Sequence, residues 1–508
     1  MLTISSALRS LYTNGGIFQF NAKLQVLDRN YNVLAEFTDE IIEGQITCDK
    51  TRDSFRNFNM RLANTSGKFT WGPNNLIWLD KYFKIFFGVW VNGGWEWLPQ
   101  GVFPCSMPIA TSEPGKNEVQ FQGSDKMAYW GKCTTDITVQ GPLPNPGSAL
   151  SLSASGSGSS LPAGTIYVQC DYTNARGRTT TGSSQASITV TAGQKITTTI
   201  TLPTNATGVG IYVGTASNPK LLGTISNTGQ ITYSGSATSG LSAIVSGNTI
   251  TVTISALASA SGASALTTST ALGADIATAI KSVLNGIETL FNLDDTSQMQ
   301  SVPYDMTWPA GTEYKQIIND LANILAWEIY YDVNGYLRFH APVDPTTTAP
   351  MWTLSSDAMG FNLWAGAERQ MDDSELANYI VVYGGSSQTS LVSYILQDTD
   401  PNSPTSIQRI GQRVYLHNNG NPDPVITTQE LAQARAQYEY KKRLQIVEKL
   451  NFKMFPCPFM EHDDVYQITD PRNGTSGKYQ VVSFTLPLGA KENTYQTGYM
   501  WQVRNFAS

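Results

Sequence analysis

The chain has 508 residues, enough for roughly three or four domains with sizeable cores. Charged residues make up only 14 % of it, against roughly 25 % in an ordinary soluble domain. The net charge is −7 and the one basic run is Lys441-Lys442-Arg443, which argues against nucleic acid as the main partner, because phosphate binding needs clustered positive charge. So few charges indicate a protein that hides much of its surface in an assembly, or one built from uncharged β-structure.

The five cysteines are widely spaced and include no CxxC pair. They indicate neither a disulfide framework nor a zinc site, so we expect five free thiols and folding in a reducing cytoplasm. The N-terminal residues lack the apolar run of a signal peptide, and ordinary secretion is therefore not expected. No window approaches the roughly 18–20 apolar residues of a membrane span, so none is predicted.

Residues 1–140 are predicted to form a first β-domain. The segments FQFNAKLQVLD and VQFQG alternate apolar and polar residues, which is typical of half-buried strands. The segment YFKIFFGVWVNGGWEWLPQGVF predicts two strands that turn at Asn92-Gly93-Gly94, because glycine supplies the positive φ of tight hairpins. Trp90, Trp95 and Trp97 flank this turn. We expect them in the core or at a subunit interface rather than in a sugar-binding platform.

Residues 141–265 differ sharply in composition from the rest. The only charged residues between positions 141 and 270 are Asp171, Arg176, Arg178, Lys195 and Lys220. Short β-prone runs separated by turn residues predict a small β-sandwich. Stretches rich in Pro, Gly, Ala and Ser on both sides predict flexible flanks. We interpret the segment as one inserted module.

Residues 266–345 predict a small α/β domain with two amphipathic helices. The apolar residues at helical spacing are Leu272, Ile276, Ile280, Val283, Leu284 and Ile287 in the first helix, and Tyr314, Ile317, Ile318, Leu321, Ile324 and Leu325 in the second. A hairpin that turns at Asn334-Gly335 is expected to follow.

Residues 346–508 predict a C-terminal β-domain with one helix over residues 427–446. Thr427 and Glu430 match a capping box at the start of this helix, and Ile426 can pack onto Leu431. Strands are expected on both sides of the helix, from NYIVVYGG to YMWQVRN.

Catalytic chemistry has few candidate residues. The three histidines, His340, His417 and His462, are scattered, and no GxSxG, HExxH, P-loop or GxGxxG motif is present. Glycoside hydrolysis needs only two carboxylates roughly 5–10 Å apart, and a sequence does not show spatial pairs.

The densest cluster of reactive side chains lies in FPCPFMEHDDVY, residues 455–466. Its side chains that can bind a metal or move a proton are Cys457, Glu461, His462, Asp463 and Asp464. We interpret the segment as the start of a strand, in which prolines fix an extended approach, acidic residues form a polar turn and Val465 begins the strand. We therefore assign no catalytic, cofactor-binding or metal-ligating residue and expect no cofactor. A metal that bridges Cys457, His462 and Asp464 is the alternative.

Several motifs follow one another in a recognisable order. The segment EGQITCDKTRDSFRNFNMRLANTSGKFTW holds an L-x-N-x-x-G pattern, and a G-V-F strand and the D-K-M of VQFQGSDKM come after it. Later come PAGTEYKQIINDLANILAWEIYYDVNGYLRF, NSPTSIQRIGQRV, the capped helix, PCPFMEHDDVYQI and GKYQVVSFTLPLG. In these motifs the chain resembles the tail hub (baseplate hub or tail-tip) proteins of tailed bacteriophages. It departs from their pattern at Asp463, where glycine is common, and in the inserted module, which resembles immunoglobulin-like or fibronectin III-like domains.

The resemblance implies a fold that is mainly β with α+β elements. It would comprise two β-barrel-like hub domains (residues 1–140 and 346–508), a small α/β domain and an inserted immunoglobulin-like or fibronectin III-like β-sandwich. It also implies a non-enzymatic homotrimer whose six barrels surround a channel and join the sixfold tail tube to the threefold tip or spike.

The implied partners are tail tube and distal tail proteins, tip, spike or fibre proteins, and the tape-measure protein. DNA could pass through the channel without being recognised. The implied location is the virion tail, assembled in the host cytoplasm. Two other functions stay open: a tail-tip adhesin whose residues 141–265 bind host-surface carbohydrate (glycans) in host attachment, and a tail-associated cell-wall hydrolase.

Overall fold

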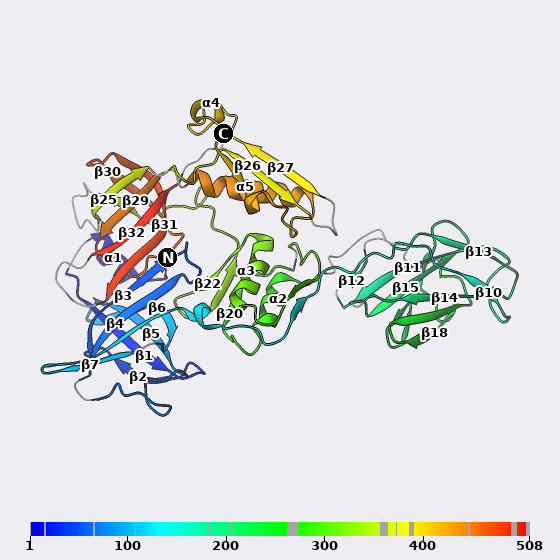
Figure 1. Ribbon diagram of the computed structural model, residues 1–508, viewed down its shortest axis with the longest axis horizontal. Coiled ribbons are helices and arrows are strands. Elements are labelled where there is room, and N and C mark those ends of the chain that lie inside the picture. The colour runs from blue at the N-terminus through cyan, green and yellow to red at the C-terminus, as the bar shows by residue number, and fades with distance from the viewer. Residues whose placement is uncertain are drawn as a thin grey trace. The chain divides into compact units, whose positions relative to one another are not determined.

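The computed structural model is mainly β, as predicted (Figure 1). It describes residues 2–503 except 15–16, 65–66, 107, 176, 180–181, 204, 262–272, 298, 356–363, 372, 386–390, 446–447 and 489–494. Within these residues, no helix combines the length and the apolar composition that crossing a bilayer requires. The five cysteines are buried and free, which confirms the expected thiols.

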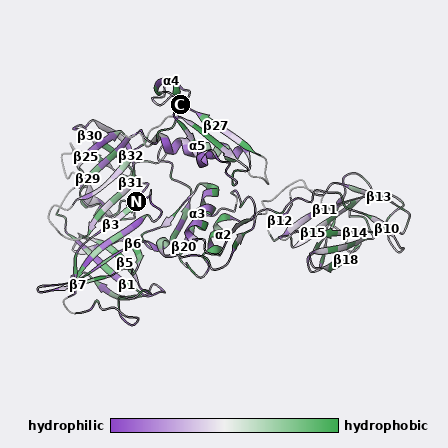
Figure 2. Ribbon diagram, viewed as in Figure 1, coloured by the Kyte–Doolittle hydropathy of each residue, from purple (hydrophilic) through white to green (hydrophobic). Residues whose placement is uncertain are grey.

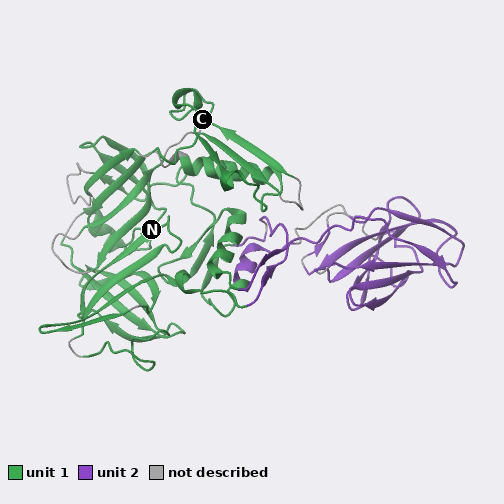
Figure 3. Cartoon of the chain, in the orientation of Figure 1, with its two compact units in different colours: residues 1–134, 283–294, 311–508 green, residues 135–282, 295–310 purple. Residues whose placement is uncertain are grey.

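The chain divides into two compact units (Figure 3). Unit 1 contains residues 1–134, 283–294 and 311–508, and unit 2 contains residues 135–282 and 295–310. Unit 1 therefore gathers residues from both ends of the sequence. The boundaries of the four domains expected from the sequence stay a prediction.

Unit 1 begins with a short helix and a four-stranded antiparallel sheet. The helix α1 (Ser6–Asn14), which was not predicted, buries Leu8 and Tyr12. The sheet has the order β2-β1-β5-β6. Its strands are β1 (Phe20–Leu27), β2 (Val33–Phe37), β5 (Tyr82–Val91) and β6 (Gly94–Pro104). The β5–β6 hairpin turns at Asn92 and Gly93, with φ of 50° and 85°, which confirms the predicted turn.

A ten-stranded sheet joins strands from both ends of the chain. Its main path is β25-β29-β32-β31-β3-β4-β8-β7, with β30 beside β31 and β24 beside β30. The strands are β3 (Ile41–Asp49), β4 (Arg56–Ala63), β7 (Ile109–Glu113), β8 (Lys116–Ser124), β24 (Thr353–Ser355), β25 (Trp364–Met371), β29 (Glu448–Met454), β30 (Val465–Asp470), β31 (Thr475–Leu488) and β32 (Gln496–Gln502).

Strand β31 carries three partners in succession. Its residues 475–480 pair with β30, residues 479–485 pair with β32, and residues 483–488 pair with β3. This one strand therefore connects the N-terminal strands to the C-terminal strands. The same hydrophobic core contains Leu24 and Phe121 from the N-terminal part and Phe452, Phe484 and Met500 from the C-terminal part.

A small α/β element of unit 1 confirms the second predicted helix and the hairpin after it. It consists of a 3₁₀ turn η1 (Lys126–Tyr129), the helix α3 (Tyr314–Leu325) and the strands β20 (Phe291–Leu293), β22 (Glu328–Tyr331) and β23 (Leu337–His340). The hairpin turns at Asn334-Gly335, where Gly335 has a φ of 81°. The first predicted helix is shorter than expected, α2 (Ile276–Val283), and Leu272 lies outside the described residues.

The predicted C-terminal helix packs on a three-stranded sheet. The sheet has the order β27-β26-β28, and the elements are β26 (Tyr379–Gly384), β27 (Val392–Gln397), β28 (Val414–Leu416), α4 (Ile407–Ile410), η2 (His417–Gly420) and α5 (Gln429–Gln445). The capping residue is one position later than predicted, because the Leu431 amide donates to the Thr428 hydroxyl at 3.4 Å. Ile426 and Leu431 share one apolar cluster, as the predicted packing required.

Unit 2 contains two sheets over one apolar core. The four-stranded sheet has the order β10-β14-β19-β18, and the six-stranded sheet has the order β12-β11-β15-β16-β17 with β13 beside β11. The strands are β10 (Ser153–Ser155), β11 (Gly164–Asn174), β12 (Gly177–Arg178), β13 (Ala186–Val190), β14 (Lys195–Thr201), β15 (Gly208–Gly214), β16 (Lys220–Ser226), β17 (Ile231–Tyr233), β18 (Leu241–Ser246) and β19 (Thr249–Ile254). Ile200, Val168 and Ile211 meet in the core between the sheets. The immunoglobulin-like or fibronectin III-like topology stays a prediction.

The chain enters and leaves the two-sheet module at neighbouring points of unit 2. Strand β9 (Ile137–Val139) pairs with β21 (Met306–Trp308), and the Ala274 amide donates to the Gln140 carbonyl at 2.8 Å. The Gly141 amide donates to the Asp305 carboxylate, also at 2.8 Å. The module is therefore an insertion with adjacent ends.

Replacing residues 142–272 by a short Gly/Ser turn should leave unit 1 folded, because closing a gap between adjacent residues costs little chain entropy. We expect the unfolding free energy of unit 1 to change by less than about 1 kcal/mol. Differential scanning calorimetry should show that one transition disappears while the other keeps its temperature. Loss of both transitions would contradict an autonomous insertion.

Candidate functional site

The segment that the sequence singled out lies in the core of unit 1. The carbonyls of Pro456 and Pro458 accept hydrogen bonds from the Tyr12 hydroxyl and the Gln100 amide, both at 2.7 Å. The fully buried side chains that follow are Cys457, Phe459 and Met460. Strand β30 then begins at Val465, which confirms the predicted start of a strand.

The acidic residues form the predicted turn before this strand. The Asp464 carboxylate accepts a hydrogen bond from the Glu461 amide at 2.9 Å, and Asp463 has a φ of 64°. Two backbone hydrogen bonds of 2.9 Å connect the turn to Val481 of β31, from the Asp463 amide to the Val481 carbonyl and from the Val481 amide to the Asp464 carbonyl. The turn is therefore fixed against the strand that joins the two ends of the chain.

Two cations at the ends of the β3–β4 connection pair with two of the three carboxyl groups of the turn. Arg56, the first residue of β4, forms an ion pair with Glu461, and Lys50, the residue after β3, forms one with Asp463. Arg56 is only 1 % exposed. Burial raises the pKa of the Glu461 carboxyl, the Arg56 guanidinium opposes that rise, and the negative charge of Asp332 adds to it. Because Glu461 and Asp463 each have a cationic partner, these two groups avoid the penalty of several kcal/mol, roughly, that an unpaired buried ion would carry.

A third segment adds a carboxyl group to the same place. Glu328 of β22 lies beside the turn. Donor atoms of Glu328, His462 and Asp463 are all within 4.8 Å of one another. Burial, and then the negative charge of Asp463, raise the pKa of Glu328 to about 8. Burial also opposes ionisation of Asp463, but the Lys50 ammonium outweighs it and lowers the pKa of that carboxyl. At neutral pH, a protonated Glu328 therefore donates a hydrogen bond to an ionised Asp463. We call Lys50, Arg56, Glu328, Glu461 and Asp463 the buried ionic cluster.

His462 is held neutral among aromatic rings. Its imidazole lies 4.4 Å from the Tyr330 ring and 5.2 Å from the Phe55 ring, measured between centroids. Burial lowers the pKa of His462 to about 3. Its Nδ1 lies 3.7 Å from the Cys48 sulfur and its Nε2 lies 3.8 Å from Asp463 Oδ2.

Cys48, His462 and Asp463 follow one another in space as the members of a cysteine-nucleophile triad do. The Cys48 thiol, however, lacks the properties of a catalytic nucleophile. Burial raises the pKa of the Cys48 thiol to about 12, and Cys48 has no exposed surface. A catalytic cysteine is instead a partly exposed thiolate with a lowered pKa. The Cys48 thiol is therefore suited to packing and to a hydrogen bond with the imidazole.

Glu328, His462 and Asp463 offer two carboxylates and an imidazole, which is a donor set that metals accept. The Lys50 ammonium, however, already supplies a cation to Asp463, and Glu328 supplies a proton. These contacts favour an ion-pair network over a metal centre. In the described part of the chain, the converging donors do not include the alternative set of Cys457, His462 and Asp464.

Of the other two histidines, His340 lies near the acidic turn, because it lines the same pocket as Glu461 and His462, whereas His417 lies in η2. His340 ends β23 and contacts the Tyr330 hydroxyl at 3.2 Å, and His417 lies 2.8 Å from the Asp423 carboxylate. Sequence reasoning did not find Lys50, Arg56 or Glu328 as partners of the acidic turn. They come from distant segments, and no local spacing relates them to residues 461–464.

The buried pair of Arg56 and Glu461 should act as one unit in stability. Arg56→Met should lower the free energy of unfolding by about 3–5 kcal/mol, because it leaves the Glu461 charge buried without a partner. The double variant Arg56→Met/Glu461→Gln should lose clearly less than the sum of the single variants. Urea unfolding measures these values.

Arg61→Met is the matched control on the same strand, because Arg61 is 33 % exposed and pairs with Glu43 at 2.7 Å. We expect it to cost about 1 kcal/mol or less. Additive single-variant effects at Arg56 and Glu461 would show that the pair does not act as a unit.

The proton on Glu328 should make stability depend on pH. Its pKa is about 8 in the folded chain, against an ordinary value of 4.5. Between pH 4.5 and pH 8 the folded state therefore holds a proton on Glu328 that the unfolded state has lost. The contribution of Glu328 to stability is lost as pH rises toward 8. Glu328→Gln keeps a donor for Asp463 and does not titrate, so its melting temperature should fall less than that of the wild type between pH 6 and pH 8.5, roughly.

Glu113→Gln, at an exposed carboxyl that ends β7, is the control and should keep the wild-type pH dependence. Thermal melts across this pH range make the comparison. An unchanged slope in Glu328→Gln would mean that Glu328 is ionised in the folded chain.

Comparison with known proteins finds similarity in solved structures, and there it extends along nearly the whole chain. No family model matches it, and no curated protein sequence matches it. Among solved structures, it is similar to a tail protein from Neisseria meningitidis MC58, with a TM-score of 0.49, 8 % identity, and coverage of 95 % of this chain and 96 % of that one. It is also similar to the 43 kDa tail protein of prophage MuSo2 from Shewanella oneidensis, with a TM-score of 0.47, 8 % identity and coverage of 95 % and 98 %.

A third similar structure is the prophage tail protein gp18 from Listeria monocytogenes EGD-e, with a TM-score of 0.41, 10 % identity and coverage of 94 % of both chains. All three of these structures are tail proteins.

Proposed function

We propose that the chain is a structural hub protein at the distal end of a bacteriophage tail. The sequence motifs that resemble tail hub proteins are spread from residue 43 to residue 489, and those in 43–71, 119–127, 456–468 and 477–489 contribute strands β3, β4, β8, β30 and β31 to one sheet. The observation that carries the proposal is the continuous pairing of β4, β3, β31 and β32, which makes one body of the two terminal parts of the chain.

Such a body suits a ring that joins two symmetries. Three copies, each with two β-rich halves, present six similar elements to a sixfold tube and three identical faces to a threefold tip. A ring of this kind uses heterologous contacts, in which one surface of a copy meets a different surface of the next copy.

Exposed apolar side chains support such contacts. The larger ones on unit 1 include Trp71, Trp78 and Leu79 in the N-terminal half, and Ile395, Val414 and Leu416 on the sheet that carries α5. Contiguous exposed apolar residues commonly mark interaction surfaces. Trp90 is also exposed, and its ring lies 5.2 Å from that of Trp95. The exposure of Trp90 favours a subunit interface over the core, which were the two places expected from the sequence.

The proposed partners are further copies of this chain, the tail tube and distal tail proteins, tip, spike or fibre proteins and the tape-measure protein. The proposed role is non-enzymatic, and the proposed location is the virion tail. The buried ionic cluster supports this role, because its charged groups pair with one another inside the body.

Residues 141–265 are proposed to decorate the assembled tail. The adjacent ends of the module support this, because an insertion of this kind can be added without changing the body that carries it. An adhesin role would follow if virions lacking residues 142–272 assembled normally and adsorbed to the host less efficiently.

The experiment that tests the hub role is cryo-electron microscopy of the virion tail tip. We expect three copies of the chain around the tail axis, with two β-rich halves of each copy facing the channel. Any other copy number at the tip, or a position outside the tail axis, would overturn the proposal. A ring of three copies with density for residues 141–265 on its outside would support both the hub role and the decorating role of residues 141–265.

A further inference from the structure

Three side chains of the buried ionic cluster bring together the groups that form an amide bond. The Lys50 ammonium pairs with the Asp463 carboxylate, and the protonated Glu328 carboxyl donates a hydrogen bond to the same carboxylate. An amine and a carboxyl group can condense with loss of water, and a neighbouring carboxylic acid can move the protons that this reaction requires. Lys50 follows β3, Asp463 precedes β30 and Glu328 lies on β22, so the three groups meet only in the folded chain.

The amine and the carboxyl group are held against each other. The side chains of Lys50 and Asp463 are only 14 % and 7 % exposed. The Gln480 amide donates a hydrogen bond at 2.9 Å to Asp463 Oδ1, which is the oxygen that the Lys50 ammonium contacts. An amine in contact with one carboxyl oxygen lies about 3–3.5 Å from the carboxyl carbon, which is the separation of reacting atoms in a near-attack geometry. The Lys50 nitrogen is thus placed to attack Asp463 Cγ.

The second oxygen of Asp463 is left for the Glu328 acid. Asp463 Oδ2 and Glu328 Oε2 are both buried, and in the described part of the chain no N–H or O–H group other than the Glu328 acid forms a hydrogen bond with them. Oxygens of the two carboxyl groups lie within 4.8 Å of each other. Because burial and then the charge of Asp463 raise the pKa of Glu328 to about 8, the acid is present at neutral pH.

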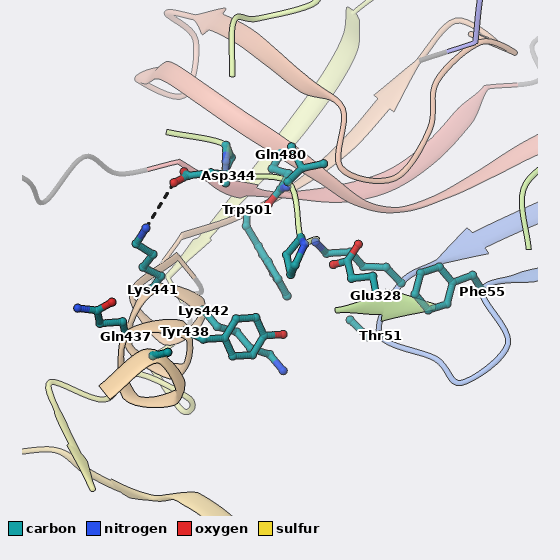
Figure 4. Close-up of a pocket in the computed structure, with 15 residues that line it drawn as sticks. Thr51, Phe55, Glu328, Asp344, Gln437, Tyr438, Lys441, Lys442, Gln480 and Trp501 are labelled. Carbon is teal, nitrogen blue, oxygen red and sulfur yellow. Dashed lines mark hydrogen bonds and ion pairs between the residues drawn. The ribbon is translucent and has the colours of Figure 1, made fainter. Parts of the chain in front are cut away.

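A pocket of about 610 Å³ adjoins these groups (Figure 4). Lys50 and Glu328 line it together with the aromatic rings of Phe55 and Trp501, and the Trp501 ring lies 5.7 Å from the Lys50 ammonium. Helix α5, which also borders the pocket, is strongly hydrophilic along its length (Figure 2). A water molecule occupies about 30 Å³ in the liquid. The pocket therefore has room, and polar partners, for a water molecule that a condensation releases.

We propose that Lys50 and Asp463 join in an intramolecular amide (isopeptide) bond, with Glu328 as the catalytic acid and base. The bond is a single event within each chain and involves no turnover of a substrate. It ties the N-terminal strands to the C-terminal strands covalently, beside the pairing through β31. The proposal goes beyond the hub role and does not depend on it.

The reaction starts from the ion pair. Burial opposes the charge on Lys50, but the Asp463 carboxylate outweighs it and raises the pKa of the ammonium. The free amine therefore forms only when a proton passes from Lys50 to Asp463, which replaces two buried charges by two neutral groups. The Lys50 nitrogen then attacks Cγ of Asp463, Glu328 gives its proton to Oδ2, and the resulting Glu328 carboxylate takes a proton from the nitrogen.

The intermediate carries hydroxyl groups at Oδ1 and Oδ2 of Asp463. Glu328 again gives its proton to Oδ2, the bond between Cγ and Oδ2 breaks, and Oδ2 leaves as water. The proton of Oδ1 returns to Glu328 through the departing water, and Oδ1 stays as the amide carbonyl oxygen beside Gln480. In sum, one bond between nitrogen and carbon forms and one water molecule is released. Nothing is oxidised or reduced.

A second buried lysine pair provides a comparison within the same chain. Lys126 pairs with Glu288 at 2.7 Å, and this pair is more deeply buried than that of Lys50. Its side-chain hydrogen-bond partners are the hydroxyl groups of Tyr31 and Tyr331, and burial raises the pKa of both. Phenols are far weaker acids than a carboxyl group. We therefore expect this pair to remain an ion pair.

Mass spectrometry of the denatured full-length protein tests the proposal. We expect at least about half of the wild-type chains to be lighter than the sequence mass by one water molecule, about 18 Da. Trypsin should release residues 30–52 joined to residues 454–472, uncut after Lys50, because a lysine in an amide bond is not a cleavage site. No linked peptide should join Lys126 to Glu288.

Glu328→Gln keeps a donor for Asp463 and removes the acid, so it should keep the full sequence mass while still melting cooperatively. Lys50→Arg keeps the positive charge without a nucleophilic amine and should also keep the full mass. Lys442→Gln, at an exposed lysine of the same pocket, is the matched control and should lose one water molecule as the wild type does.

The full sequence mass in the wild type would overturn the proposal, whatever the variants show. The same loss of water in Glu328→Gln would overturn the role of Glu328. Loss of water without the linked peptide would indicate a cyclised aspartate and would overturn the bond. A linked peptide between Lys126 and Glu288 would also contradict the account, because it would show that burial of an ion pair is enough.

Discussion

The structure of unit 1 depends on one strand, β31, which pairs with an N-terminal strand along one part of its length and with C-terminal strands along the other. Fourteen residues pair first with β30, then with β32 and then with β3. Neither half of the sheet is complete without the other, because each uses part of the same strand. Bringing together residues so distant in sequence costs chain entropy, and the shared apolar core offsets that cost.

The buried ionic cluster lies directly beside this strand. The acidic turn is hydrogen-bonded to Val481 of β31, its charges pair with Lys50 and Arg56 beside β3 and β4, and Glu328 reaches it from β22. Buried ion pairs add little net stability compared with apolar packing, but a mispaired arrangement would leave charges unmatched at great cost. The cluster therefore favours one arrangement of three segments over the others. This explains why the reactive side chains of residues 461–463 form ion pairs and hydrogen bonds within the protein.

Local features of this fold were predictable from the sequence, and long-range pairings were not. Helix α3 was predicted because its apolar residues repeat at helical spacing over three turns, and the hairpin after it was marked by Asn334-Gly335. The turn before β30 was likewise predicted from its prolines and acidic residues. Helix α1 was missed because its nine residues bury only Leu8 and Tyr12, too few to show a period. The convergence of Glu328, Lys50 and Arg56 on the acidic turn depends on contacts between distant segments, which leave no pattern in neighbouring residues.

The central claim is that the two ends of the chain form one cooperative body through β31. Native-state hydrogen exchange, followed by mass spectrometry in increasing urea below the unfolding transition, tests it most directly. If the claim is right, peptides from β3, β4, β30 and β31 exchange with the same free energy of opening and the same dependence on urea. If the peptides from β29, β30 and β32 open at a lower free energy while those from β3 and β4 stay protected, the two ends are separate folding units and the account is wrong.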